Sequence, residues 1–364
     1  MNSDGGNSRM ESVLDQTAPI RKGEELDLEA VRKYLVEAVP GLAGEIEIEQ
    51  FPSGHSNLTY FVKVGDREMV LRRPPFGSKV KSAHDMSREY KILSAIHPVY
   101  DRVPRPLAYC EDESVIGARF YVMERIRGVI LRRTLPDGLT LPPETVERLA
   151  RNLIKNLAEI HAIDYEAVGL GAIARVEGFL ARQVNGWADR YYGSQTHEIP
   201  GVEQVIQWTR ENVPASPPAT LIHNDYKYDN MVLDGKDITR IIGVLDWEMS
   251  TVGDPLMDLG VALSYWVQAD DPPELLSSAF GPTAAPGSPT RKQLADYYAE
   301  LTGRDVSNLH YYLCFAMFKL AVILQQIYYR FAKGHTHDER FGPLIDMVKL
   351  LVRTAEALIE RGHI

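Results

Sequence analysis

A polar loop between two apolar segments carries the residue types that phosphoryl transfer requires. The loop has the pattern H-x-D-x-K-x-x-N, formed by His223, Asp225, Lys227 and Asn230, and Asp246 follows Asn230 by sixteen positions. Phosphoryl transfer needs a group that orients the attacking hydroxyl, a cation near the γ-phosphate and oxygen ligands for Mg²⁺. We predict that Asp225 orients the hydroxyl and that Lys227 supplies the cation. Asn230 and Asp246 are the predicted metal ligands.

The alternative for this loop is a polar hairpin turn in which Asp and Asn act as caps. Such a turn needs no Asp at the end of the following apolar run, where Asp246 stands. The four matching positions and this fifth residue favour the catalytic interpretation.

With these residues the chain resembles the protein-kinase-like superfamily, in its aminoglycoside phosphotransferase and choline kinase branch. It is most similar to the phosphotransferase-like domains related to the N-terminal part of acyl-CoA dehydrogenase family members 10 and 11. The resemblance extends over about residues 26–360 and is most specific at 223–230 and 245–259. It implies a bilobal fold with ATP between the lobes, Asp225 as the catalytic Asp and His223 as the structural His of the loop. It also implies that Asp258 ties this loop to the following helix.

The first part of the chain contains weaker candidates for nucleotide binding. The turn 51–58 stands where the resemblance puts a loop that covers the nucleotide, although it has only one Gly. Backbone N–H groups and short polar side chains can still bind phosphates, but an ordinary hairpin turn is equally compatible with this string. The candidate phosphate-binding residues are Ser53, Gly54, Ser56 and Asn57.

Two further parts of a kinase-like nucleotide site have counterparts. Arg72 replaces the usual strand Lys and would pair with Glu89 of the next helix, although Arg73 could serve instead. A guanidinium can bind phosphate or carboxylate through two hydrogen bonds, so the replacement is chemically tolerable. At the hinge, Glu124 and Ile126 would contact adenine through backbone atoms, and a plain strand and turn is the alternative.

The segment after Asp246 limits the acceptor to a small molecule. Asp246-Trp247-Glu248 replaces D-F-G, and only twelve positions separate Asp246 from Asp258. A protein kinase needs a long activation segment there, so we expect no peptide acceptor and no control by loop phosphorylation. The basic segment 72–81 would attract an anionic acceptor, and the resemblance suggests a hydroxyacyl-CoA; a solvated loop is the alternative.

Composition excludes several other classes of protein. The 364 residues carry 40 Lys and Arg against 50 Asp and Glu, a net charge of −10, which argues against a nucleic-acid partner. Two cysteines, Cys110 and Cys314, provide no disulfide framework. The polar first ten residues lack an apolar signal segment, so we expect a cytoplasmic location. The apolar stretch 311–329 is interrupted by polar residues, which indicates a core helix and no membrane partner.

The elements that must position these residues form two lobes. We expect an α+β fold of the bilobal protein-kinase-like type, with a small antiparallel-sheet lobe followed by a larger, mainly helical one. Residues 1–24 are expected to be a flexible tail, 25–128 the nucleotide-binding lobe and 129–364 the catalytic and substrate-binding lobe. The predicted strands are 46–51, 58–64, 68–72, 105–110 and 119–125, with short apolar pieces at 221–223, 231–234 and 241–246. The predicted helices are 26–39, 83–96, 142–161, 179–192, 202–212, 255–268, 291–302, 309–333 and 341–360, and 277–289 is a predicted surface loop.

These features favour an enzyme that uses ATP and Mg²⁺ to phosphorylate the hydroxyl of a small molecule. An aminoglycoside-type antibiotic kinase is the alternative enzyme. A nucleotide-binding pseudokinase is the alternative from another class, although a binding module has no need for Asp225, Asn230 and Asp246 together. The acceptor, the oligomeric state and the choice between ATP and GTP stay open at this point.

Overall fold

The computed structural model describes residues 16–364 apart from 53–56, 77–84, 280 and 337. Within this part the chain forms two compact units. The first, which we call the strand-rich unit, contains the chain up to Ile130 together with Pro136–Gly138 and Asn230–Ser250. The second, the helical unit, contains Leu131–Leu135, Leu139–Asp229 and Thr251–Ile364. The division into domains at residue 128 stays a prediction.

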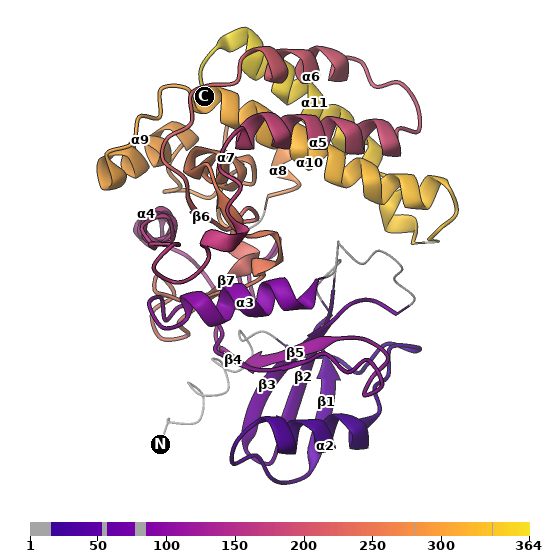
Figure 1. Cartoon of the computed structure of the whole chain (residues 1–364). Coiled ribbons are helices and arrows are strands. Elements are labelled where there is room, and N and C mark those ends of the chain that lie inside the picture. Colours follow the sequence, from indigo (N-terminus) through magenta and orange to yellow (C-terminus); the bar gives the residue numbers. More distant parts are fainter. Residues whose placement is uncertain (1–15, 53–56, 77–84, 280, 337) are drawn as a thin grey trace. The chain divides into compact units, whose positions relative to one another are not determined.

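One antiparallel sheet with the strand order β1-β2-β3-β5-β4 forms the strand-rich unit (Figure 1). Side chains alternate between the two faces of a strand. Tyr60 of β2 and Leu71 of β3 belong to the core that Leu35 of helix α2 completes, so Arg72 points to the opposite face, where helix α3 lies. The elements are α2 (Leu28–Ala38), β1 (Ile46–Gln50), β2 (Leu58–Val64), β3 (Arg67–Arg73), α3 (Met86–Ile96), β4 (Pro106–Cys110) and β5 (Phe120–Glu124).

Two segments from outside this run of chain attach to the unit. Ala18 exchanges two backbone hydrogen bonds with Gln50, at 2.8 and 2.9 Å, so the described part of the predicted tail is held on β1. The segment Asn230–Ser250 forms an antiparallel hairpin of β7 (Met231–Leu233) and β8 (Ile241–Val244). Val129 and Leu233 exchange backbone hydrogen bonds of 2.8 Å, which joins this hairpin to the chain after β5.

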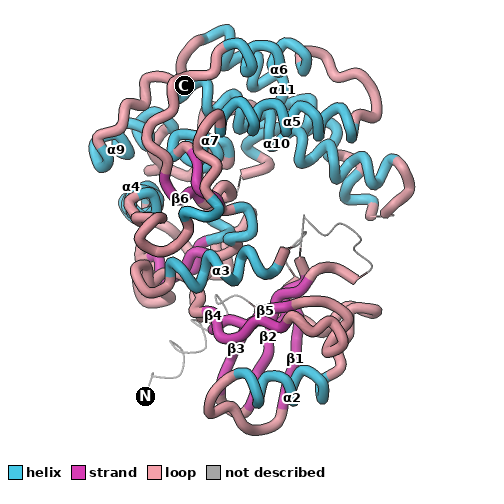
Figure 2. The backbone as a smooth tube through the Cα atoms, viewed as in Figure 1, coloured by secondary structure: helices cyan, strands magenta, loops and turns pink. Residues whose placement is uncertain are grey.

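The helical unit is organised around the long helix α10, which packs against α11, α7 and α5. Figure 2 shows this unit as mostly helical, with β6 as a short strand. Gly260 of α7 is needed where α7 meets α10, because a Cβ there would lie 2.8 Å from the carbonyl oxygen of Tyr312. The elements are α4 (Pro143–His161), α5 (Phe179–Ser194), α6 (Val202–Glu211), β6 (Thr220–Ile222), β9 (Thr251–Gly253), α7 (Pro255–Ser264), α8 (Pro273–Leu276), α9 (Arg291–Thr302), α10 (Leu309–Ala332) and α11 (Leu344–Arg361).

Helix α10 is also the one helix in the described chain with the length and apolar composition of a membrane span. Inside the structure, 67% of its most apolar window is buried. A core helix of a globular protein has these same properties, and the contacts of α10 with three other helices agree with the predicted core helix.

The predicted α+β fold is confirmed, with a five-stranded antiparallel sheet preceding the main helices. Four details differ from the sequence prediction. The predicted helix 255–268 ends at Ser264, and the strand β9 and the short helix α8 were not predicted. The predicted surface loop 277–289 is partly buried: Thr283 is 2% exposed, and the indole of Trp266 donates to the carbonyl oxygen of Pro289 at 2.9 Å.

Candidate active site

Arg72 of β3 is the centre of a buried cluster of charges in the strand-rich unit. Its Nη1 donates to Glu89 Oε1 of α3 at 2.5 Å, so the predicted pair of Arg72 and Glu89 is present. Its Nη2 donates to Asp246 Oδ1 at 2.9 Å and to Glu248 Oε2 at 3.4 Å. Burial lowers the pKa of Arg72, but Glu89 and the other acidic neighbours outweigh burial and raise it well above its ordinary value. Arg72 is therefore a permanent cation among three carboxylates.

The neighbouring Arg73 has a different environment, which follows from the alternation of side chains along β3. Its Nη1 donates to the carbonyl oxygen of Ile116 at 2.9 Å, and its guanidinium lies 3.6 Å from the centre of the Phe76 ring. Arg73 is only 2% exposed. The suggestion that Arg73 is free to attract an anionic acceptor is therefore wrong, because its hydrogen bonds are used inside the unit. Lys79 and Lys81 lie outside the described residues.

The predicted nucleotide-covering loop 51–58 is described only at its two ends. Asn57 is 4% exposed, and its Nδ2 donates to Glu248 Oε2 at 2.5 Å. This contact joins the loop to the Arg72 cluster through Glu248. Ser53, Gly54 and Ser56 lie outside the described residues, so their role in phosphate binding stays a prediction.

The predicted hinge residues lie at the end of β5, apart from the Arg72 cluster. The backbone N–H of Glu124 donates to the carbonyl oxygen of Arg105 at 2.9 Å, so this N–H is already used. Ile126 packs on β8 at Gly243, where an added Cβ would come within 2.8 Å of Ile126 Cδ1. Contact of Glu124 and Ile126 with adenine stays a prediction. Glu124 would have to make this contact through an atom other than its backbone nitrogen.

The two predicted metal ligands occupy the same end of the β7–β8 hairpin. Met231 pairs with Val244, so Asn230, before β7, and Asp246, after β8, are brought together, and the N–H of Leu245 donates to the carbonyl oxygen of Asn230 at 2.8 Å. Antiparallel pairing is thus the reason for the sixteen-residue spacing. Asp246 has a left-handed backbone, with φ of 65°, which is uncommon for a residue other than Gly.

The donor set at this end of the hairpin fits Mg²⁺. Carboxylate and amide oxygens are its preferred protein ligands, and the ion usually keeps only one or two of them. Asp246 and Asn230 match that number, and the described residues contain no group of three or more His, Cys, Asp or Glu arranged to bind a metal. Burial raises the pKa of Glu89, but Asp246 and Glu248 alone outnumber the single Arg72 guanidinium, and a divalent cation would offset this excess of negative charge.

Asp225 lies in the helical unit, in the loop that follows β6. Lys227 Nζ lies 3.0 Å from Asp225 Oδ2, and the hydroxyl of Tyr265 donates to Asp225 Oδ1 at 2.9 Å. The carboxylate is therefore oriented from both of its oxygens. Burial lowers the pKa of Lys227, but Tyr265, Asp225 and Asp229 outweigh burial and raise it well above its ordinary value. Burial also raises the pKa of Asp229 to about 6.

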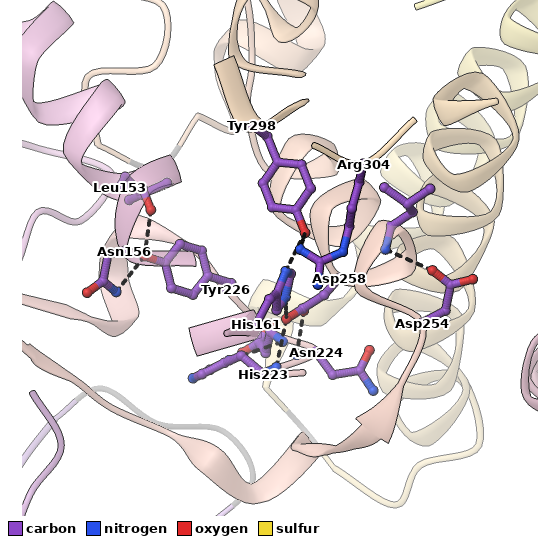
Figure 3. A network of polar contacts seen from close by, with 12 residues as sticks. Leu153, Asn156, His161, His223, Asn224, Tyr226, Asp254, Asp258, Tyr298 and Arg304 are labelled. Carbon is purple, nitrogen blue, oxygen red and sulfur yellow. Dashed lines mark hydrogen bonds and ion pairs between the residues drawn. The ribbon is translucent and has the colours of Figure 1, made fainter. Parts of the chain in front are cut away.

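The backbone of this loop is held by the fully buried carboxylate of Asp258 in α7, as the resemblance implies. Asp258 Oδ2 accepts from the N–H of His223 at 2.7 Å, and Oδ1 accepts from the N–H of Asn224 at 2.6 Å (Figure 3). His223 Nδ1 in turn lies 3.3 Å from the backbone N of Asp225, which donates to it. This hydrogen bond is compatible with a structural role for His223 in the loop, which stays a prediction.

A relay of hydrogen bonds supports Asp258 from the other side (Figure 3). His161 Nε2 lies 3.1 Å from Asp258 Oδ2, and His161 Nδ1 lies 2.7 Å from the hydroxyl of Tyr298. Burial lowers the pKa of His161, so a neutral imidazole donates to Asp258 and accepts from Tyr298. Burial raises the pKa of Asp258, but the bonds from His161 and the loop outweigh burial and lower it.

Comparison with known proteins identifies the family. Residues 47–294 match the model of the phosphotransferase enzyme family. The chain belongs to this family. It is 33% identical over 360 residues to acyl-CoA dehydrogenase family member 11 of Gallus gallus, covering 96% of this chain and 46% of that protein. The chain therefore spans about half the length of the curated relatives that it matches.

Solved structures of phosphotransferases have the same fold. A protein of Ralstonia eutropha JMP134, provisionally designated an aminoglycoside phosphotransferase, is 30% identical with a TM-score of 0.76, covering 92% of this chain and 99% of that one. A thermostable mutant of the aminoglycoside phosphotransferase APH(4)-Ia, crystallised with AMP-PNP and hygromycin B, is 17% identical with a TM-score of 0.57, covering 92% of this chain and 99% of that one.

Several residues around the candidate site of this phosphotransferase were missed by sequence analysis. Glu248 had a local signal, since it lies two positions after Asp246. Tyr265 and His161 had none: Tyr265 directly follows α7, His161 is the last residue of α4, and each meets its partner only through the fold. Lys319 is one of the polar residues that interrupt the apolar stretch 311–329, and its position in a buried helix was the available signal.

Proposed function

We propose that this protein is an ATP- and Mg²⁺-dependent kinase that phosphorylates a hydroxyl group of a small molecule, with a hydroxyacyl-CoA as the candidate acceptor. The observation that carries the proposal is the setting of Asp225, whose carboxylate is held by Lys227 at 3.0 Å and by Tyr265 at 2.9 Å. A carboxylate held in this way can accept a hydrogen bond from an incoming hydroxyl and take its proton late in the transfer.

Each unit would supply a separate part of the chemistry. In the strand-rich unit, Arg72 would bind ATP phosphate, and Asn230 with Asp246 would hold Mg²⁺, which would neutralise charge on the phosphates. In the helical unit, Asp225 would orient the acceptor, and Lys227 would lie near the transferred phosphoryl group. Membership in the phosphotransferase enzyme family supports this assignment, as does the AMP-PNP complex of the structurally similar APH(4)-Ia.

The choice of a hydroxyacyl-CoA as the candidate acceptor depends on the names of the relatives that this chain matches. Acyl-CoA dehydrogenase family member 11 is named for acyl-CoA chemistry, and this chain matches 46% of its length. A phosphotransferase domain that is part of the same polypeptide as an acyl-CoA dehydrogenase would act on related thioesters. The charge argument from the basic segment is weaker than the sequence suggested, because Arg73 is bonded inside its unit.

The test offers candidate acceptors in parallel with Mg²⁺ and ATP and measures ADP release. We expect turnover with 3-hydroxyacyl-CoA thioesters and none with kanamycin or hygromycin B. The Asp225→Asn variant is the control for contaminating kinases. Turnover with an aminoglycoside alone would assign the protein to the antibiotic kinases. An ATP-dependent thermal shift without turnover on any acceptor would favour a pseudokinase.

A further inference from the structure

A buried lysine in the core of the helical unit contacts the loop that carries Asp225. Lys319 lies in the middle of α10 and is only 3% exposed. Its Nζ donates to the carbonyl oxygen of Asn224 at 2.9 Å and to Asn224 Oδ1 at 2.7 Å. An ammonium group is costly to bury unless it is paired with acceptors. Its place in the buried part of a mostly apolar helix therefore requires a reason, and both of its acceptors belong to one loop residue.

Asn224 has a backbone conformation that must be held. Its φ is 69°, in the left-handed region that residues other than Gly seldom adopt. The N–H of Asn224 donates to Asp258 Oδ1 at 2.6 Å, while Lys319 binds its carbonyl oxygen and its side chain. Three atoms of Asn224 are thus fixed from two helices, directly before Asp225 in the chain. The direction in which the Asp225 side chain leaves the backbone depends on this conformation.

Charged residues of the loop itself, of α5 and of α7 face Lys319. Asp225, Asp258 and Lys227 are charged neighbours, as is Arg190 of α5. The ring of Trp187 in α5 lies 5.6 Å from Lys319 Nζ. Burial lowers the pKa of Lys319 to about 8. A neutral amine would still have hydrogens to donate to both Asn224 acceptors, so the hydrogen bonds survive deprotonation.

We propose that Lys319 is a positioning residue, which locks Asn224 in its left-handed conformation and so aims the carboxylate of Asp225 at the acceptor hydroxyl. The inference rests on the function proposed for Asp225. It differs from a role in core packing, because a packing residue would affect stability without a specific effect on turnover.

The main experiment compares Lys319→Met with a control on the same helix, Gln325→Met. Gln325 is also buried, but its Nε2 donates to the carbonyl oxygen of Ser194 at 2.7 Å, away from the loop. With Mg²⁺, ATP and an acceptor that the wild type accepts, we expect kcat to fall about 100-fold in Lys319→Met, the cost of a misplacement of about 1 Å. The KM for ATP should stay within about threefold, and Gln325→Met should keep its kcat within the same factor.

A second variant separates the conformational role from packing. Gly adopts the left-handed conformation without strain, so Asn224→Gly should restore most of the lost kcat when combined with Lys319→Met. Lys319→Gln, which keeps a donor, serves if the Met variant fails to fold. The proposal is overturned if kcat is unchanged in Lys319→Met, or if Asn224→Gly gives no rescue.

A measurement without an acceptor distinguishes this proposal from the proposed function. Amide hydrogen exchange of the peptide 221–228 should be faster in Lys319→Met than in the wild type and unchanged in Gln325→Met. Failure of the wild type to phosphorylate any acceptor would reject the proposed function. Unchanged exchange in Lys319→Met would reject the role of Lys319 whatever the outcome for activity.

Discussion

The two units of the molecule hold their key charged residues in opposite ways. In the strand-rich unit, the single guanidinium of Arg72 is surrounded by Glu89, Asp246 and Glu248, so negative charge is in excess. In the helical unit, the carboxylates of Asp225, Asp229 and Asp258 lie among the cations of Lys227, Lys319 and Arg190. The first cluster needs an added cation for neutrality, and the second is balanced by the protein itself.

This difference agrees with a division of labour between the two clusters. A carboxylate that must accept a hydrogen bond from a hydroxyl benefits from neighbours that orient it, and Lys227 and Tyr265 do so. A group of carboxylates that outnumbers its cation is suited to a metal and, through the metal, to phosphates. The following predictions test this contrast.

The largest effect is expected at Asp225. Asp225→Asn removes the group that takes the proton of the acceptor, so kcat should fall by at least about 10³-fold, while ATP binding stays close to that of the wild type. Turnover on the identified acceptor and calorimetric titration with Mg²⁺ and ATP measure the two quantities. Wild-type turnover in this variant would remove Asp225 from its proposed role.

A large effect is also expected when the Arg72 cluster loses its cation. Arg72→Met leaves Glu89 buried beside two other carboxylates, and an uncompensated buried charge costs about 3–5 kcal/mol of unfolding free energy. Affinity for ATP should fall as well. Arg73→Met is the matched control, because its guanidinium meets neutral carbonyl oxygens. Denaturant titration and ATP binding compare the two variants, and equal loss of ATP affinity in both would contradict the assignment of Arg72.

The metal ligands should show a smaller and more specific effect. Asp246→Ala and Asn230→Ala remove one of the few protein ligands of Mg²⁺, so binding of ATP with Mg²⁺ should weaken about 10- to 100-fold. Binding of ATP without the metal should change much less. Titrations with and without Mg²⁺ check this. If both variants bind ATP with Mg²⁺ as tightly as the wild type, the metal site lies elsewhere.

The smallest effect concerns the pH dependence of stability at Asp229. Its pKa of about 6 lies above the ordinary value near 4, so the folded state binds this proton more tightly than the unfolded state does. The stability that this proton provides is complete below about pH 4 and is lost as the pH rises through 6. As the pH rises from about 4 to above 6, the unfolding free energy of Asp229→Asn should therefore increase by about 1–2 kcal/mol relative to that of the wild type. Denaturant titrations at pH 4.5 and 7 measure the difference, and a constant difference would show that Asp229 is not perturbed.

Much of the fold was predictable because its signals are local. The five strands of the sheet and the main helices lie within a few residues of their predicted ranges, since apolar residues repeat every second position in strands and about every third or fourth in helices. The loop of the candidate site was predictable for the same reason. His223, Asp225 and Lys227 are neighbours in the chain, and the loop conformation brings them together.

The errors arose where contacts join distant parts of the chain. The loop 277–289 has the Gly and Pro content of a surface loop, yet Thr283 and Pro289 are buried, and the carbonyl oxygen of Pro289 accepts a hydrogen bond from the indole of Trp266. Arg72 and Arg73 could not be distinguished by type. Only the pairing of β3 with its neighbours shows which face meets α3 and its Glu89.

The sequence by itself therefore determined the elements, the catalytic loop and the likeness to phosphotransferases, since all of these depend on residue types at short spacing. The tertiary structure decided which side chains complete the site. Tyr265 meets Asp225 across 40 positions, and Lys319 meets Asn224 across 95. Contacts over such separations depend on how α7 and α10 pack around Gly260, and no local pattern of residues records that packing.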